Sequence, residues 1–326
     1  MPTAIYVALI CLIAFIFDFI NGFHDAANSV ATVVSTRVLR PAYAVVWAAF
    51  FNFLAVFVFG VKVANTIGKI VHAPAVNNEL ILAALVGAIA WDLLTWWLGL
   101  PTSSSHALIG GLAGAALVQS GWHSLQTGEL ALISVFIVLS PLIGLVLGFI
   151  MRTLLSWIFR RTSPKAVSPL FRRLQLVSAA LYSLGHGTND AQKTMGVVAL
   201  LLFSNGYLSS FYIPFWVVML AYAAIGLGTM AGGWRIIKTM GMKITKLQPV
   251  DGFCAEVSAA ISLFGTAHAG IPVSTTHTIT GAIIGVGSTK RLSAVRWGVT
   301  IGVVWAWVLT IPGAAAIAAL MRLALG

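Results

Sequence analysis

The chain has 326 residues, of which 59% are hydrophobic and only 8% are charged. Soluble domains carry about 25% charged residues, so this composition excludes a water-soluble globule and predicts an all-α polytopic membrane protein. The net charge of +11 is then explained by Lys and Arg between apolar stretches, which orient the chain in the bilayer, and no nucleic-acid partner is expected.

Apolar stretches of about 20 residues predict membrane helices. In chain order they cover 4–36, 42–61, 79–100, 103–119, 130–158, 175–204, 210–233, 252–270, 273–289 and 297–322. The stretches 4–36 and 175–204 are too long for one crossing and contain Gly, Asn and Asp, which predicts broken helices. The stretches 103–119 and 273–289 begin at Pro and fit full crossings, half-helices or arms of re-entrant hairpins. We therefore expect about 10–12 membrane segments.

The segment 159–174 divides the apolar stretches into two sets and carries Arg and Lys without any acidic residue. The positive-inside rule places this loop in the cytoplasm. With five segments on each side of the loop, both termini are predicted to lie outside a cell membrane. The sequence thus predicts a first half at 1–158, a basic loop at 159–174 and a second half at 175–326.

Two polar runs resemble each other across the halves, "NGFHDAANS" at 21–29 and "HGTNDAQKT" at 186–194. Their alignment pairs Asp25 with Asp190. A charged side chain at the centre of a membrane helix costs about 2.5–3.5 kcal/mol on insertion scales, so such a carboxylate normally pairs, binds a cation or carries a proton. We expect Asp25 and Asp190 to bind coupling cations, sodium ions or protons, and the alternative is a lock between packed helices.

A second pair of motifs follows in the same order, "PTSSSHALIGG" at 101–111 and "PVSTTHTITGA" at 272–282. Pro and Ser/Thr are typical of the first turn of a helix, where they cap free amides, and two facing helix starts would also attract an anion. His106 and His277 are expected to support the site by hydrogen bonds. An odd number of crossings per half makes this an inverted-topology repeat, a plan of secondary transporters.

Several residues lie near the acidic pair in sequence, and the role of Lys193 among them has two alternatives. Lys193 lies three residues after Asp190, so it either pairs with this carboxylate along the helix or helps to hold an anion. Asn28 occupies the equivalent place in the first half. Asn189 is expected to contribute to cation binding, and Asn21 to support the site by hydrogen bonds.

Glu256 begins another apolar stretch and either faces the site as a cation ligand or lies near the cytoplasmic interface. Asp18 and Asp92 also lie within spans and have no counterpart in the other half. The chain contains neither a His-Glu-x-x-His metal motif nor a Gly-x-Ser-x-Gly nucleophile elbow. An enzyme is therefore not expected, and no cofactor is expected apart from the coupling ions.

These motifs resemble those of the inorganic phosphate transporter (PiT) family along essentially the whole chain. The resemblance implies uptake of inorganic phosphate in symport with sodium ions or protons, by a homodimer in the bilayer. It implies cation binding at Asp25, Asp190 and Glu256, and phosphate and cation binding at Asn28, Ser103, Ser104, Ser105, Ser274, Thr275 and Thr276. We add Asn189 to the expected cation ligands and Lys193 to the expected phosphate ligands.

One departure from the family pattern is Asn52, in "FFNFLA", where many members have Glu. The missing negative charge leaves the coupling ion and the stoichiometry open. The same hydroxyls and amides would also suit sulfate, another tetrahedral oxyanion or a metal–phosphate complex. A passive anion channel is a further alternative.

Overall fold

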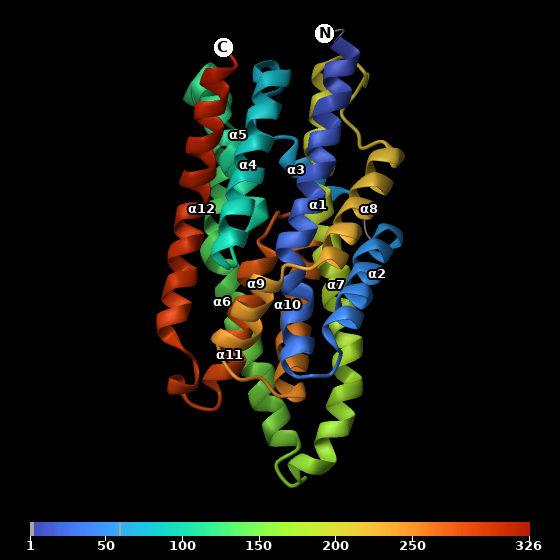
Figure 1. Ribbon diagram of the computed structural model, residues 1–326, viewed down its shortest axis with the longest axis vertical. Coiled ribbons are helices and arrows are strands. Elements are labelled where there is room, and N and C mark those ends of the chain that lie inside the picture. The colour runs from blue at the N-terminus through green and yellow to red at the C-terminus, as the bar shows by residue number, and fades with distance from the viewer. Residues whose placement is uncertain (1–2, 59) are drawn as a thin grey trace.

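A computed structural model describes residues 3–58 and 60–326 as an elongated helical bundle without a β-strand in those ranges (Figure 1). Its α-helices are α1 (Thr3–Ser35), α2 (Pro41–Leu54), α3 (Lys62–Ile67), α4 (Asn78–Leu98), α5 (Ser104–Ser120), α6 (Thr127–Ile158), α7 (Pro164–Ser204), α8 (Phe215–Ala231), α9 (Trp234–Lys238), α10 (Pro249–Ala269), α11 (Thr275–Ser288) and α12 (Trp297–Ala324). The all-α membrane architecture expected from the composition is confirmed.

Fewer helices than expected have the length and composition of a membrane crossing. Among the described residues these are five, namely α1, α4, α6, α10 and α12. A sixth is obtained when α8 is joined to the segment 234–243, which follows at a bend of 62°. The other expected segments form the shorter helices α2, α5 and α11, and α7, which is long but contains the polar motif.

The expectation of broken helices at 4–36 and 175–204 is wrong. Helix α1 runs for 33 residues and α7 for 41 residues, and the polar motifs lie inside both. Their glycines serve close packing: a Cβ on Gly22 would lie 2.2 Å from the backbone oxygen of Ile225 in α8, and one on Gly187 2.4 Å from that of Asn52 in α2. Small residues let membrane helices approach closely, so a glycine here marks a crossing and not an end.

The breaks that do occur lie between α4 and α5 and between α10 and α11. Gly99 and Gly270 end α4 and α10, and Ser103 and Ser274 cap the starts of α5 and α11. Both serines are buried, with exposed fractions of 1% and 0%, so the two turns lie inside the protein. The structure therefore favours the interpretation of 103–119 and 273–289 as hairpin arms.

The second arm of each hairpin packs against a helix from the other half of the chain. Helix α5 lies against α12, and α11 lies against α6, while α1 packs on α8 and α7 on α2. Three groups of mutually packed helices result: α4, α5 and α12; α6, α10 and α11; and α1, α2, α7 and α8. Both termini lie at one end of the bundle, and the connection between α6 and α7 lies at the other (Figure 1).

Candidate functional site

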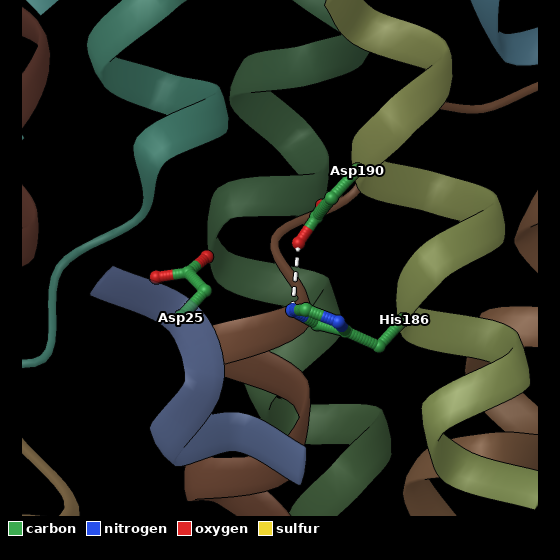
Figure 2. Close-up of side chains that lie close together, drawn as sticks. All are labelled: Asp25, His186 and Asp190. Carbon is green, nitrogen blue, oxygen red and sulfur yellow. Dashed lines mark ion pairs between the residues drawn. The ribbon is translucent and has the colours of Figure 1, made fainter. Parts of the chain in front are cut away.

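The two repeated aspartates meet at the centre of the bundle. Asp25 on α1 and Asp190 on α7 lie close to His186 of α7, with one potential ligand atom of each within 4.8 Å of the others (Figure 2). Nε2 of His186 lies 3.1 Å from Oδ2 of Asp190. All three side chains are at most 2% exposed, so the cluster is closed to both ends of the bundle.

The first turn of α11 joins the two aspartates. Thr275 donates a hydrogen bond of 2.9 Å to Oδ2 of Asp190, and Thr276 donates one of 3.4 Å to Oδ2 of Asp25. The amide of Asn28 on α1 donates to both hydroxyls, at 3.3 and 2.9 Å. Residues of the two sequence motifs, predicted separately, therefore form one connected set of polar groups.

Lys193 brings a buried positive charge into this set. Its Nζ lies 2.5 Å from Oδ1 of Asp190, so the ion pair along the helix is formed. The same ammonium donates to the hydroxyl of Ser105 on α5 and to the backbone oxygen of Val273, at 3.1 Å from the latter. Lys193 thus connects α7 with the tips of both hairpins.

The starts of the two hairpin helices face each other. The hydroxyls of Ser103 and Ser274 accept hydrogen bonds from the backbone amides of His106 and His277, so both serines are helix caps. The rings of His106 and His277 meet with their centroids 4.8 Å apart, and His277 stacks on Trp307 of α12. The histidines pack beside the two helix starts, and Nδ1 of His277 lies 3.3 Å from the backbone oxygen of Ile137 on α6.

Glu256 on α10 belongs to a separate polar set. Thr32 of α1 donates to its carboxylate at 2.6 Å, Gln175 of α7 donates at 3.0 Å, and Ser178 also donates to it. Thr32 follows Asp25 by two helical turns, which is about 10 Å along α1. The side chain of Glu256 is fully buried, and its hydrogen bonds join it to α1 and α7 and not to the aspartate pair.

The remaining predicted residues have different surroundings. The amide nitrogen of Asn189 donates to the backbone oxygens of Gly185 and Leu263, at 2.9 and 3.3 Å, which turns it toward backbone and not toward a carboxylate. Asn21 lies beside the buried carboxylate of Asp18. Ser104 lies beside Asp92, which is also fully buried.

Several further residues contact the site, and of these Tyr182 was not singled out from the sequence. Nδ1 of His24 lies 2.7 Å from Oδ1 of Asp25, and Tyr182 donates to the backbone oxygen of Thr275 at 3.2 Å. Nδ1 of His186 lies 3.2 Å from Oδ1 of Asn52. The helical spacing of polar residues would have identified many of the residues at the site. Polar side chains recur every three or four residues along α1, at Asp18, Asn21, Asp25, Asn28, Thr32 and Thr36, and along α7, at Gln175, Ser178, Tyr182, His186, Asn189 and Lys193.

Comparison with known proteins agrees with this architecture. A probable low-affinity inorganic phosphate transporter of Rhizobium meliloti is 60% identical over 310 residues, which cover 94% of this chain and 93% of that protein. A protein of the same description from Bacillus subtilis is 45% identical over 316 residues, 96% of this chain and 95% of that one. A solved structure described as a sodium-dependent phosphate transporter superposes with a TM-score of 0.90, at 27% identity and 98% coverage of both chains.

The model of the phosphate transporter family matches residues 21–318, which include the aspartate pair, both hairpin tips and Glu256. The relatives are transporters and not enzymes, as the absence of hydrolase motifs from the sequence led us to expect. The match to the family model, the 60% identity to a full-length relative and the shared architecture lead to one conclusion: this chain belongs to the phosphate transporter family.

Proposed function

We propose that the protein imports inorganic phosphate by symport with cations, through alternating access to the central site. The observation that carries this proposal is that the first turn of α11 joins Asp25 and Asp190 by hydrogen bonds. These contacts link two carboxylates, which are suited to cations, with a helix start, which is suited to an anion. The description of the structural relative as sodium-dependent supports sodium as the coupling ion. Protons are the alternative.

The cations are proposed to bind at Asp25 and Asp190, with Asn189 and Glu256 as further candidates. Carboxylate, hydroxyl and amide oxygens are the ligands that hard cations prefer, and Thr275 and Thr276 add hydroxyls at the two aspartates. Thr32, which donates to the buried Glu256 of α10, lies two turns from Asp25 along α1. Glu256 is therefore placed to bind a cation on its path to or from the aspartate pair. A cation at Asp190 would compete with the ammonium of Lys193 for the same carboxylate.

Phosphate is proposed to bind between the hairpin tips. There the N-termini of α5 and α11 present amides and hydroxyls that favour an anion. Lys193 already contacts Ser105, so an ammonium displaced from Asp190 remains near this site. The proposed phosphate ligands are those implied by the sequence motifs: Asn28, Ser103, Ser104, Ser105, Lys193, Ser274, Thr275 and Thr276.

Alternating access is proposed to follow from an inverted repeat of residues 1–158 and 175–326. The packing supports the repeat, because α5 with α12 and α11 with α6 are equivalent pairs, as are α1 with α8 and α7 with α2. The termini lie opposite the basic loop, which supports termini outside and a loop in the cytoplasm (Figure 1). A homodimer is proposed from the family resemblance.

Uptake of labelled phosphate into proteoliposomes tests the function directly. An inward sodium gradient and an inward proton gradient are applied in turn, and phosphate should accumulate above its equilibrium level with one of them. Equilibration without accumulation under either gradient would indicate a passive channel. Competition by sulfate, arsenate and divalent cations then separates phosphate from another oxyanion or from a metal–phosphate complex.

A further inference from the structure

The end of the bundle opposite the termini contains a cavity of about 570 Å³ that lies away from the central site. It lies between the end of α6, the start of α7 and the start of α10. Its lining divides into an apolar part, which includes Leu155, Phe159 and Phe171, and a polar part, which includes Arg152, Lys165 and Ser168. A volume of several hundred Å³ is typical of ligand pockets and exceeds the need of a single small ion.

The apolar part is a largely aromatic wall. The rings of Phe159 and Phe171 meet at a centroid distance of 5.5 Å, and Phe171 contacts Phe253 of α10 at 5.4 Å. Phe171 is almost fully buried, whereas Leu155 and Phe159 are partly exposed. The wall therefore continues from the protein interior to the surface of α6, where a hydrocarbon chain would contact it.

The polar part is positively charged. Arg152 and Lys165 line the cavity, and the neighbouring segment 159–174 has no acidic residue. The nearby acid Asp251 is buried and already paired, at 2.7 Å with Arg152 and at 2.6 Å with Lys290. Arg152 uses Nε for Asp251 and Nη1 for Ser156, and a guanidinium has five N–H donors, so it retains capacity for an anion.

The depth of the cavity matches the headgroup layer of a bilayer. Trp157 on the last turn of α6 is 63% exposed, and the guanidinium of Arg160 lies 4.9 Å from its ring centre. Exposed Trp together with Arg is typical of the interface between lipid and water. Ser156 and Phe159, which flank this tryptophan in sequence, line the cavity.

We propose that this cavity is a binding site for an anionic phospholipid, with the headgroup phosphate at Arg152 and Lys165 and an acyl chain along Leu155 and Phe159. Basic pockets between membrane helices suit anionic headgroups. The amphipathic lining favours a lipid over free phosphate, which has no part to place on the aromatic wall. The bound lipid would tie α6, α7 and α10 together at this end of the bundle.

Purified protein in detergent tests the proposal with phosphatidylglycerol, phosphatidylcholine of the same acyl chains and inorganic phosphate. Native mass spectrometry counts the retained lipids, and thermal unfolding gives the midpoint shift. Phosphatidylglycerol should be retained and should raise the midpoint more than phosphatidylcholine. Lys165→Gln should weaken its binding about fivefold, since one basic side chain is removed from an anionic headgroup. Ser168→Trp, which keeps both cations but fills the cavity, should weaken it as well.

Arg161→Gln is the matched control, because Arg161 belongs to the same exposed loop but does not line the cavity. It should change phosphatidylglycerol binding less than twofold. Equal loss in Arg161→Gln and Lys165→Gln would mean diffuse attraction and would overturn the proposal. A stabilisation by inorganic phosphate that Lys165→Gln removes would assign the cavity to free phosphate instead. The retained lipid and the thermal midpoint are both measured without transport, so they test this proposal separately from the proposed function.

Discussion

Lys193 places a full charge in the interior of the bundle, where only 1% of its side chain is exposed. Its pairing with Asp190 is therefore a condition for burial as well as a candidate step in transport, since an unpaired buried charge is strongly destabilising. These two roles can be separated by experiment, because stability depends on charge balance whereas the proposed transport step depends on the carboxylate itself.

Asp190→Asn is expected to abolish gradient-driven phosphate uptake and to lower stability by about 3–5 kcal/mol, because Lys193 loses its partner. The double variant Asp190→Asn/Lys193→Met should regain most of the thermal midpoint, since both charges are then gone, but should remain inactive. Uptake in proteoliposomes and unfolding in detergent measure the two effects. Active transport by the double variant would exclude Asp190 from cation binding.

Thr276 offers a finer test, since it accepts a hydrogen bond from Asn28 and donates one to Asp25. Thr276→Val keeps the shape but removes the hydroxyl, and the loss of roughly 1–3 kcal/mol should lower uptake about tenfold or more. Thr276→Ser should retain most activity. The matched control is Thr280→Val, one turn later on α11, because the hydroxyl of Thr280 has no hydrogen-bond partner among the described residues. Equal losses at the two positions would contradict the assignment.

At the scale of helices, the repeated glycines set the distance between neighbours. Gly187 brings α7 against the backbone of α2, and Asn52, whose backbone it contacts, also lies beside His186 through its side chain. The packing of α7 on α2 and the position of His186 are consequently linked. A change in one crossing distance should therefore reach the central site.

Gly187→Ala is expected to reduce stability by about 1–3 kcal/mol, because its Cβ would lie 2.4 Å from the Asn52 oxygen. Gly265→Ala on α10 is the control, since a Cβ there has no atom within 4 Å, and it should be neutral or slightly stabilising. Thermal unfolding of both variants in the same detergent measures the difference. A midpoint for Gly187→Ala equal to that of the parent protein would contradict close packing at this crossing.

The same glycines explain what could be predicted from the sequence. Asp25, Asp190 and Thr275 were identified because charged and hydroxyl residues repeat in an otherwise apolar chain. The continuity of α1 and α7 was not predicted, because a glycine at a helix crossing and a glycine at a helix break look alike in one sequence. Thr32 and Ser178 were missed because their importance depends on Glu256 from a distant helix.

For the whole molecule, the three groups of helices meet at the central site. The aspartates belong to the group of α1, α2, α7 and α8, whereas the hairpin tips belong to the other two groups. Cations at the aspartates and phosphate at the tips would thus hold different groups together. Each ligand should favour the other, because opposite charges attract strongly in a site closed to water.

Sodium and phosphate together are therefore expected to raise the thermal midpoint by more than the sum of their separate effects. Unfolding is measured with sodium chloride, potassium phosphate and sodium phosphate at constant ionic strength. The Asp25→Asn variant should lose the excess shift while remaining folded. Strictly additive shifts in the parent protein would count against coupled binding.

The packing of α5 on α12 also has a consequence for biosynthesis. A ribosome delivers α5 to the membrane long before it has translated α12, which ends the described chain. Until then, the face of α5 that will contact α12 must be covered by lipid or by the insertion machinery. The early half of this protein can thus reach its final packing only when α12 has been synthesised.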